Sequence, residues 1–186
     1  MQASDHLNGI DVAALRQVGT AVAADPVLGQ AAFGVRTSWL GGTRSRAATL
    51  PLTLGSETFA RDFTIEADEP TQLLGRDQAV NPQELLLAAL NACMTVGLVA
   101  NAALRGIALE KLEIETSGAL DLRGFLAIDP AVNPGYDTVK VTVHIRSNAD
   151  AAEVEALFQH VLKTSPNFNN FARPIEMQAS LRHQGA

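Results

Sequence analysis

The stretch from Leu85 to Leu104 is twenty residues long and carries no charged side chain. A run of this length and polarity is close to what a helix needs to cross a bilayer. It is equally typical of the central helix of a soluble domain, because a helix that is buried on all sides must be apolar on all sides. Asn91, Thr95 and Asn101 interrupt the run, and no second span follows it. We therefore expect a buried central helix and no membrane partner.

The residues that flank this run carry signals for the two ends of a helix. Asn81 is a favourable N-cap, Pro82 suits the first helical position, and Glu84 interacts favourably with the helix dipole. Gly106 is a typical residue just beyond a C-terminus. The sequence therefore predicts one long helix over residues 82–104.

The rest of the chain alternates between strand-like and amphipathic segments. The pattern predicts a helix from residue 12, a hairpin over 33–54, and further strands near 58–66, 107–121, 137–147 and 173–182, with a helix over 149–162. Few consecutive strands are joined by crossover helices, so the order indicates an α+β fold with antiparallel sheet. We divide the chain into an N-terminal helical extension, residues 1–30, and a main domain, residues 31–186.

Composition excludes several classes of function. The 186 residues are 47% hydrophobic and carry a formal net charge of −6, with the arginines scattered along the chain. Nucleic acid is therefore not an expected partner. The single cysteine cannot form an intramolecular disulfide, and no Cys/His cluster offers metal ligands. The opening MQASDHLNG lacks the features of a secretion signal, so we expect a cytoplasmic protein without metal or cofactor.

The single cysteine, Cys93, lies in the middle of the long apolar run. One interpretation is an inert thiol, because free cysteine is among the most buried residue types. The other is a reactive centre, because an activated thiolate is a strong nucleophile. The residues alone leave both open.

Three motifs in this order carry a resemblance to a known family: DEPTQLLGRD, NPQELLLAALNACMTVGLVANAALRGI and KTSPNFNNF. Over about residues 31–183 the chain resembles the osmotically inducible protein C family, which includes the organic hydroperoxide resistance proteins. Three further stretches resemble a longer branch of this family: NGIDVAALRQ, DLRGFLAID and NPGY. The resemblance implies an α+β homodimer in which two long central helices are wrapped by sheets from both chains.

The resemblance also implies a chemistry for two positions. In the peroxidase members a cysteine on the central helix attacks the peroxide, and Cys93 matches it. A second cysteine, in a Cys-Pro motif, then forms a disulfide with the oxidised first one. Ser165 stands at that position, and a hydroxyl cannot close a disulfide.

The family's arginine and glutamate match this chain less directly. The arginine position falls near Thr43, with Arg44 and Arg46 adjacent; Arg46 is our first choice and Arg44 follows closely. The glutamate position falls on Gln83 and not on Glu84. Ten residues of helix span about 15 Å, so residue 83 cannot reach Cys93 along one continuous helix. It must act across a dimer interface or through a bend.

Several charged residues can also be interpreted as purely structural. Arg36, Arg44 and Arg46 are each also interpretable as solvated hairpin charges. Asp68 and Glu69 indicate a turn with Pro70, or alternatively a role in closing the site.

Two functions from different classes remain. In the first, Cys93 reduces a small hydrophobic hydroperoxide, and an external thiol resolves the oxidised cysteine. In the second, a non-catalytic dimer binds a hydrophobic small molecule in the remnant pocket. In both we expect a homodimer whose interface buries well above ~2,000 Å², since a monomer would expose too much of the apolar helix.

Overall fold

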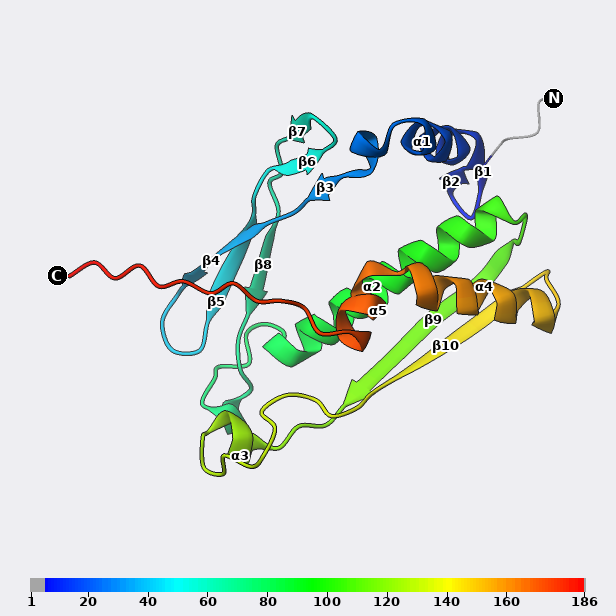
Figure 1. The fold of residues 1–186 in the computed structure, drawn as a ribbon. Coiled ribbons are helices and arrows are strands. Elements are labelled where there is room, and N and C mark those ends of the chain that lie inside the picture. Colours follow the sequence, from blue (N-terminus) through cyan, green and yellow to red (C-terminus); the bar gives the residue numbers. More distant parts are fainter. Residues whose placement is uncertain (1–5, 186) are drawn as a thin grey trace.

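The computed structural model describes residues 6–185 and has an α+β fold (Figure 1). The central element is α2 (Pro82–Leu104), which contacts one long antiparallel hairpin and two helices further along the chain. These are β9 (Leu109–Gly118), β10 (Val139–Ser147), α4 (Ala151–Thr164) and α5 (Pro166–Ala172). Every strand pair in the described residues is antiparallel. The predicted fold class and the antiparallel sheets are confirmed.

Helix α2 begins and ends where the sequence predicted. Asn81 Oδ1 accepts a hydrogen bond from the amide of Gln83 at 2.7 Å, and Glu84 Oε2 accepts one from the amide of Asn81 at 2.9 Å. Gly106 follows the helix with φ of +76°, a conformation that glycine adopts without strain. Length and composition alone would allow α2 to cross a membrane, but the core helix of a soluble protein meets the same test. Only 22% of its apolar window is buried within the single chain.

The hydrophobic core lies between α2, α4 and the β9–β10 hairpin. It is built from five buried side chains that come from three segments: Leu98, Ala102, Ile107, Leu157 and Val161. Gly97 lets α4 approach closely, because a Cβ at this position would lie 3.1 Å from Cγ1 of Val161. Apolar side chains of β9 and β10 cover the cluster from the sheet side. This half of the chain therefore has a closed core of its own.

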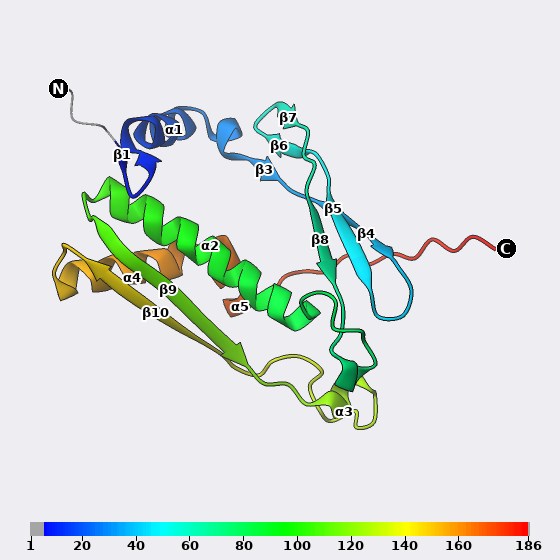
Figure 2. The ribbon, with the colours of Figure 1, turned by 180° about the vertical axis from the view of Figure 1, so that it is seen from behind.

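Two small sheets lie apart from this core (Figure 2). One has the order β4 (Val35–Trp39), β5 (Ser45–Thr49), β8 (Thr64–Ala67), and the other β3 (Ala31–Ala32), β6 (Leu52–Leu54), β7 (Glu57–Phe59). The sequence predicted one continuous hairpin and one strand over 58–66. Each is instead divided between the two sheets, and Pro51, which lacks an N–H, stands at the break between β5 and β6.

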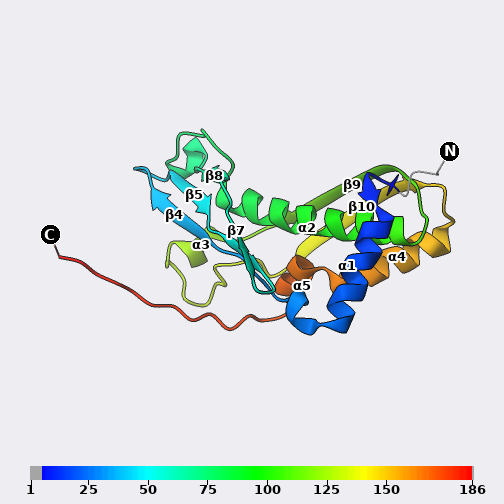
Figure 3. The same ribbon diagram turned by 90° about the horizontal axis from the view of Figure 1, so that it is seen from above.

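Residues 6–30 cross the C-terminal end of α2 (Figure 3). They form β1 (His6–Leu7), β2 (Ile10–Asp11), α1 (Val12–Ala24) and the short 3-10 helix η1 (Pro26–Gly29). The Asn8 side chain donates to the carbonyl of Ile107 at 2.9 Å and accepts from the amide of Leu109 at 2.8 Å. Arg16 donates to the carbonyl of Leu104 at 3.4 Å. The extension is thus tied to the turn between α2 and β9.

One predicted element is wrong, and several short elements were missed. Residues 173–182 do not form a strand but run as an exposed, extended segment, because no neighbouring strand is paired with them. The short helix α3 (Leu122–Phe125) and helix α5 were not predicted. Residues 1–5 and 186, which belong to the predicted extension and main domain, lie outside the described residues.

Candidate functional site

Cys93 lies at the middle of α2 and is half-buried. Its nearest polar partner comes from the junction between α4 and α5, where the hydroxyl of Ser165 donates a hydrogen bond to Sγ at 3.5 Å. The two side chains are 72 residues apart in sequence. The fold therefore brings together two residues that lie in separate motifs of the sequence.

Ser165 is held in a fixed orientation by its place between two helices. It is only 2% exposed, ends α4 and caps α5. Its hydroxyl accepts from the amide of Phe168 at 3.4 Å, and its carbonyl accepts from the side chain of Asn169 at 2.9 Å. Asn167 donates to the carbonyl of Ala89 at 2.8 Å and so ties α5 to α2. The hydrogen-bonded turn between α4 and α5 therefore directs the hydroxyl toward the sulfur.

A polar pair on the sheet side of α2 fixes the helix near Cys93. The Asn91 side chain donates to the carbonyl of Ile114 at 3.2 Å, and the hydroxyl of Thr116 donates to Asn91 Oδ1. Both partners lie on β9. The half-buried Asn91 amide is thus hydrogen-bonded on both its nitrogen and its oxygen, which ties α2 to β9. The sequence pattern gave no indication of this pair.

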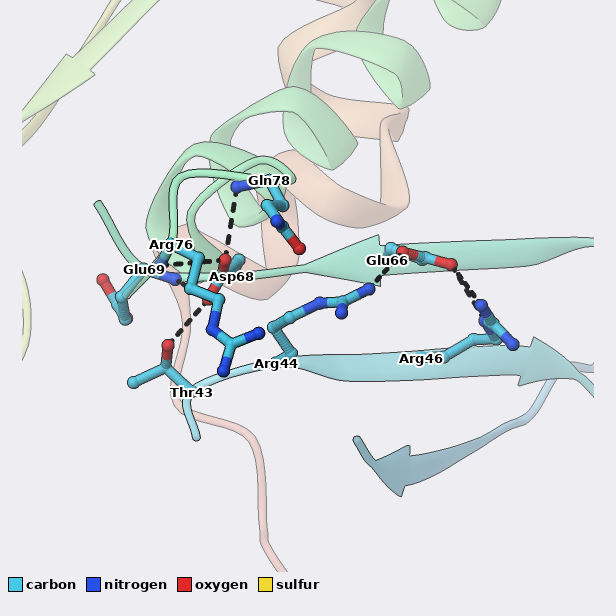
Figure 4. A network of polar contacts seen from close by, with 8 residues as sticks. All are labelled: Thr43, Arg44, Arg46, Glu66, Asp68, Glu69, Arg76 and Gln78. Atoms are coloured by element: carbon cyan, nitrogen blue, oxygen red, sulfur yellow. Dashed lines mark hydrogen bonds and ion pairs between the residues drawn. The ribbon is translucent and has the colours of Figure 1, made fainter. Parts of the chain in front are cut away.

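Arg44 and Arg46 converge on Glu66 and not on Cys93 (Figure 4). Arg46 donates through Nε and Nη2 to Glu66 Oε1 at 2.9 and 2.6 Å, and Arg44 Nη2 lies 3.5 Å from Oε2. The hydrogen bonds and charge of Arg46 hold the pKa of Glu66 below its ordinary value. Arg46 and Glu66 are directly opposed in the β5–β8 ladder. No hydrogen bond joins either arginine to Cys93 within residues 6–185.

Gln83 and Glu84 lie at the first turn of α2, far from Cys93. The Gln83 side chain is exposed, and the Glu84 carboxylate is engaged with the amide of Asn81. Because α2 is continuous over 23 residues, neither side chain reaches the sulfur on its own helix. The carboxylate that meets the arginines in this chain is Glu66, which sequence reasoning missed. No sequence signal indicates this pairing, because it depends on the register between β5 and β8.

Asp68 is fully buried and acts as the centre of the loop over residues 69–78 (Figure 4). Its carboxylate accepts from the Thr43 hydroxyl at 2.7 Å and from the amides of Glu69, Arg76 and Gln78 at 2.9, 3.1 and 3.2 Å. The hydrogen bond from Thr43, followed by those from the backbone, lowers the pKa of Asp68 although burial opposes this. The turn predicted with Pro70 is present, and Asp68 joins it to the β4–β5 hairpin.

An apolar cavity of about 460 Å³ lies beside this loop. Its walls are the turn at Leu73 and Leu74 and the residues of α3 and its end, Leu122, Phe125 and Leu126, with Thr43, Glu69 and Gln72 as polar lining. Cys93 is not part of the lining. Among residues 6–185 no group of three His, Cys, Asp or Glu side chains is arranged to hold a metal ion.

The family of the chain follows from a match to a family model. The model described as "OsmC-like protein" matches residues 75–180, which is more than half of the 186 residues. The matched span contains α2, Cys93 and Ser165. The chain therefore belongs to the OsmC-like family, as the sequence motifs predicted.

Solved structures support the same fold. An OsmC-like protein from Mycoplasma pneumoniae matches with a TM-score of 0.61 at 17% identity, over 76% of this chain and 87% of that one. An OsmC-like protein of unknown function from Vibrio cholerae matches with a TM-score of 0.57 at 13% identity, over 74% and 92%. A putative osmotic stress induced and detoxification response protein from Psychrobacter arcticus 273-4 matches with a TM-score of 0.55 at 18% identity, over 73% and 85%. A comparison with curated proteins finds no match.

Proposed function

We propose that the protein reduces organic hydroperoxides through Cys93 and depends on an external thiol for turnover. The observation that carries the proposal is the hydrogen bond from the Ser165 hydroxyl to the sulfur of Cys93 at 3.5 Å. A half-buried sulfur with one fixed donor remains accessible to a small peroxide. The thiolate is the reactive form of a cysteine.

The reaction needs only one protein thiol for its first step. The Cys93 thiolate attacks the terminal oxygen of the hydroperoxide, an S–O bond forms, and the O–O bond breaks. The departing alkoxide takes up a proton and leaves as an alcohol. Cys93 is oxidised by two electrons to the sulfenic acid.

The second step needs a thiol that this chain does not supply. Ser165 cannot form a disulfide, and Cys93 is the only cysteine. An external thiol therefore attacks the sulfenic sulfur and releases water, which leaves a mixed disulfide. A second thiol then restores Cys93 and departs as the oxidised disulfide. We place this reaction in the reducing cytoplasm, where such thiols are kept available.

The test is to oxidise the protein with one equivalent of cumene hydroperoxide and to trap sulfenic acid with dimedone. We expect a dimedone adduct on Cys93 by mass spectrometry, and none in a Cys93→Ser control. A Ser165→Cys variant is expected to form an internal disulfide with Cys93, provided the two Cα atoms lie within the ~7 Å limit for bridging. An unmodified Cys93 in the folded wild-type protein would overturn the proposal.

We further propose that the working unit is a homodimer with an interface well above ~2,000 Å². Two surfaces of the single chain support this. Val96 on α2 is 68% exposed, and Val35 and Trp39 on β4 are 58% and 76% exposed. A second copy that covers α2 with the apolar face of its β4–β5–β8 sheet would bury both surfaces. A monomer in sedimentation at micromolar concentration would overturn the dimer.

The 460 Å³ apolar cavity supports a second candidate, the binding of a hydrophobic small molecule. Its size lies within the range of ordinary ligand sites. We expect an apolar fluorescent probe such as anilinonaphthalene sulfonate to bind wild type and Cys93→Ser equally, and to be lost in Phe125→Asp. Equal binding to the wild type and to both variants would show that the probe does not occupy this cavity.

A further inference from the structure

The NPGY motif and the aspartate that follows it form a short hydrogen-bonded loop before β10. The Asn133 side chain accepts a hydrogen bond from the amide of Gly135 at 3.2 Å and donates one to Asp137 Oδ1 at 2.8 Å. One asparagine thus holds both ends of the loop. None of these residues contributes to the hydrogen bonds around Cys93, so the motif has no part in the chemistry proposed above.

The ring of Tyr136 lies against a glycine at the end of the β9–β10 ladder. Gly118 is paired with Val139, and a Cβ at position 118 would lie 2.7 Å from Cδ1 of the ring. Such a contact is too short to be tolerated, so any side chain at this position would displace the ring. The absence of a side chain at Gly118 therefore sets where the ring of Tyr136 lies.

A pocket of about 240 Å³ opens beside this ring, between α2, α5 and the start of β10. Its lining includes three half-buried aromatic side chains, Tyr136 from the loop and Phe168 and Phe171 from α5, together with the buried Leu90 of α2. The exposed Asp137 adds a carboxylate. Among the described residues, the lining has no lysine, arginine or histidine.

The charge distribution of this pocket favours a cation. The faces of aromatic rings are negative, and they attract ammonium groups within about 6 Å of the ring centre. Asp137 has no ion pair with another described residue, and its side-chain hydrogen bond comes from the neutral amide of Asn133. Its negative charge is therefore available to a ligand.

We propose that this pocket binds a small quaternary ammonium ion. Methyl groups on the nitrogen would pack against the aromatic rings and Leu90, whereas a primary ammonium would lose hydrogen bonds to water that one carboxylate cannot replace. The volume lies below the roughly 300–1,000 Å³ of sites for drug-sized ligands, so the ligand is small. A phosphate or carboxylate on the ligand would be repelled by Asp137, so the preferred ligand has a single positive charge.

Binding here depends neither on the chemistry of Cys93 nor on the homodimer. The apolar cavity at Phe125 is a separate site, because the two linings share no residue.

The first test compares choline with its neutral analogue dimethylbutanol, in which tert-butyl replaces trimethylammonium. Tyr136 is the only tyrosine of the chain, so protein with isotope-labelled tyrosine gives one set of ring signals in NMR. We expect choline to shift these signals saturably and the neutral analogue to bind about 5–30-fold more weakly. Phosphocholine, which adds a phosphate, should also bind more weakly than choline.

Two variants test the residues that the proposal names. Asp137→Asn can still accept from Asn133 and should weaken choline binding about 2–5-fold. Glu115→Gln is the matched control, because it removes an exposed carboxylate of β9 that does not line the pocket. Gly118→Ala should weaken binding about 5-fold or more by displacing the ring of Tyr136.

Circular dichroism checks the fold of each variant. If Gly118→Ala does not fold, Phe171→Leu removes one aromatic face while keeping an apolar wall, and the same loss is expected. Equal binding of choline and its neutral analogue would overturn cation recognition. Absence of a saturable shift at Tyr136, or choline binding that is unchanged in Asp137→Asn and in the aromatic variant, would overturn the site.

Discussion

The two halves of the main domain differ in how far they can fold alone. Around α2, β9, β10 and α4 the chain closes its own core, and Leu98, Leu157 and Val161 are fully buried. Between residues 31 and 67 no side chain is buried. The first half therefore resembles an autonomous domain, whereas the second presents apolar surface that only another chain can cover. Cys93 lies in the first half, and Arg44 and Arg46 lie in the second.

Leu98→Ala tests the closed half most directly. The side chain is fully buried in the core cluster, so we expect the free energy of unfolding to fall by about 2–5 kcal/mol. Chemical denaturation measures the change. Lys140→Ala, on the exposed face of β10, is the control and should stay within about 0.5 kcal/mol. Equal effects of the two changes would mean that this core is not the main source of stability.

Val96→Asp tests the surface of α2 that the second half of a partner chain would cover. Val96 is exposed in the single chain, so the folded protomer should survive, but a charge buried in the proposed interface is costly. We expect the dimer dissociation constant to rise at least about 100-fold, which is about 2.8 kcal/mol. Sedimentation measures it, and circular dichroism checks the fold. Thr142→Asp on β10 is the control, and an unchanged dimer in Val96→Asp would contradict the interface.

Asp68→Asn tests the hydrogen bonds that link the β4–β5 hairpin to the loop over residues 69–78. The amide nitrogen of Asn would face the backbone donors of Arg76 and Gln78, so we expect faster hydrogen exchange of the 69–78 loop at neutral pH. The pKa of Asp68 is lowered from 3.8, so its contribution is fully present above pH 3.8. It is lost as the pH falls below 3.8, through the folded-state pKa. The variant should lack this acid step, and an identical acid profile in wild type and variant would refute the assignment.

Ser165→Ala should have the smallest effect. It removes the cap of α5 and the donor to Cys93, and we expect about 1 kcal/mol of destabilisation. The rate at which cumene hydroperoxide oxidises Cys93 should also fall, because the sulfur loses its hydrogen bond. Ser165→Thr keeps the hydroxyl and should restore both properties. Retained stability with an unchanged oxidation rate in Ser165→Ala would show that the hydroxyl serves neither purpose.

Sequence reasoning was most successful where local signals act alone. Asn81, Pro82 and Gly106 mark the ends of α2 through cap chemistry that depends only on neighbouring residues. The predicted strand over 173–182 was wrong for the single chain because alternation cannot tell whether a partner strand is present.

The site was predictable in part for the same reason. Cys93 and Ser165 were singled out by their motifs, and the fold brings them together. Glu66 was missed as the partner of Arg46, since that pairing depends on the register between two strands and not on spacing in sequence. Sequence reasoning also gave no sign of the cavity at Phe125, because it arises where two distant loops meet.

The hydrogen bonds of Asn8 also constrain the order in which the chain can assemble. Its partners at Ile107 and Leu109 lie 99 and 101 residues further along the sequence. At a synthesis rate of about 5–20 residues per second, roughly 5–20 seconds pass on the ribosome before that turn exists. During this interval α1 has no surface to bind, so its docking must follow the formation of the α2–β9 turn.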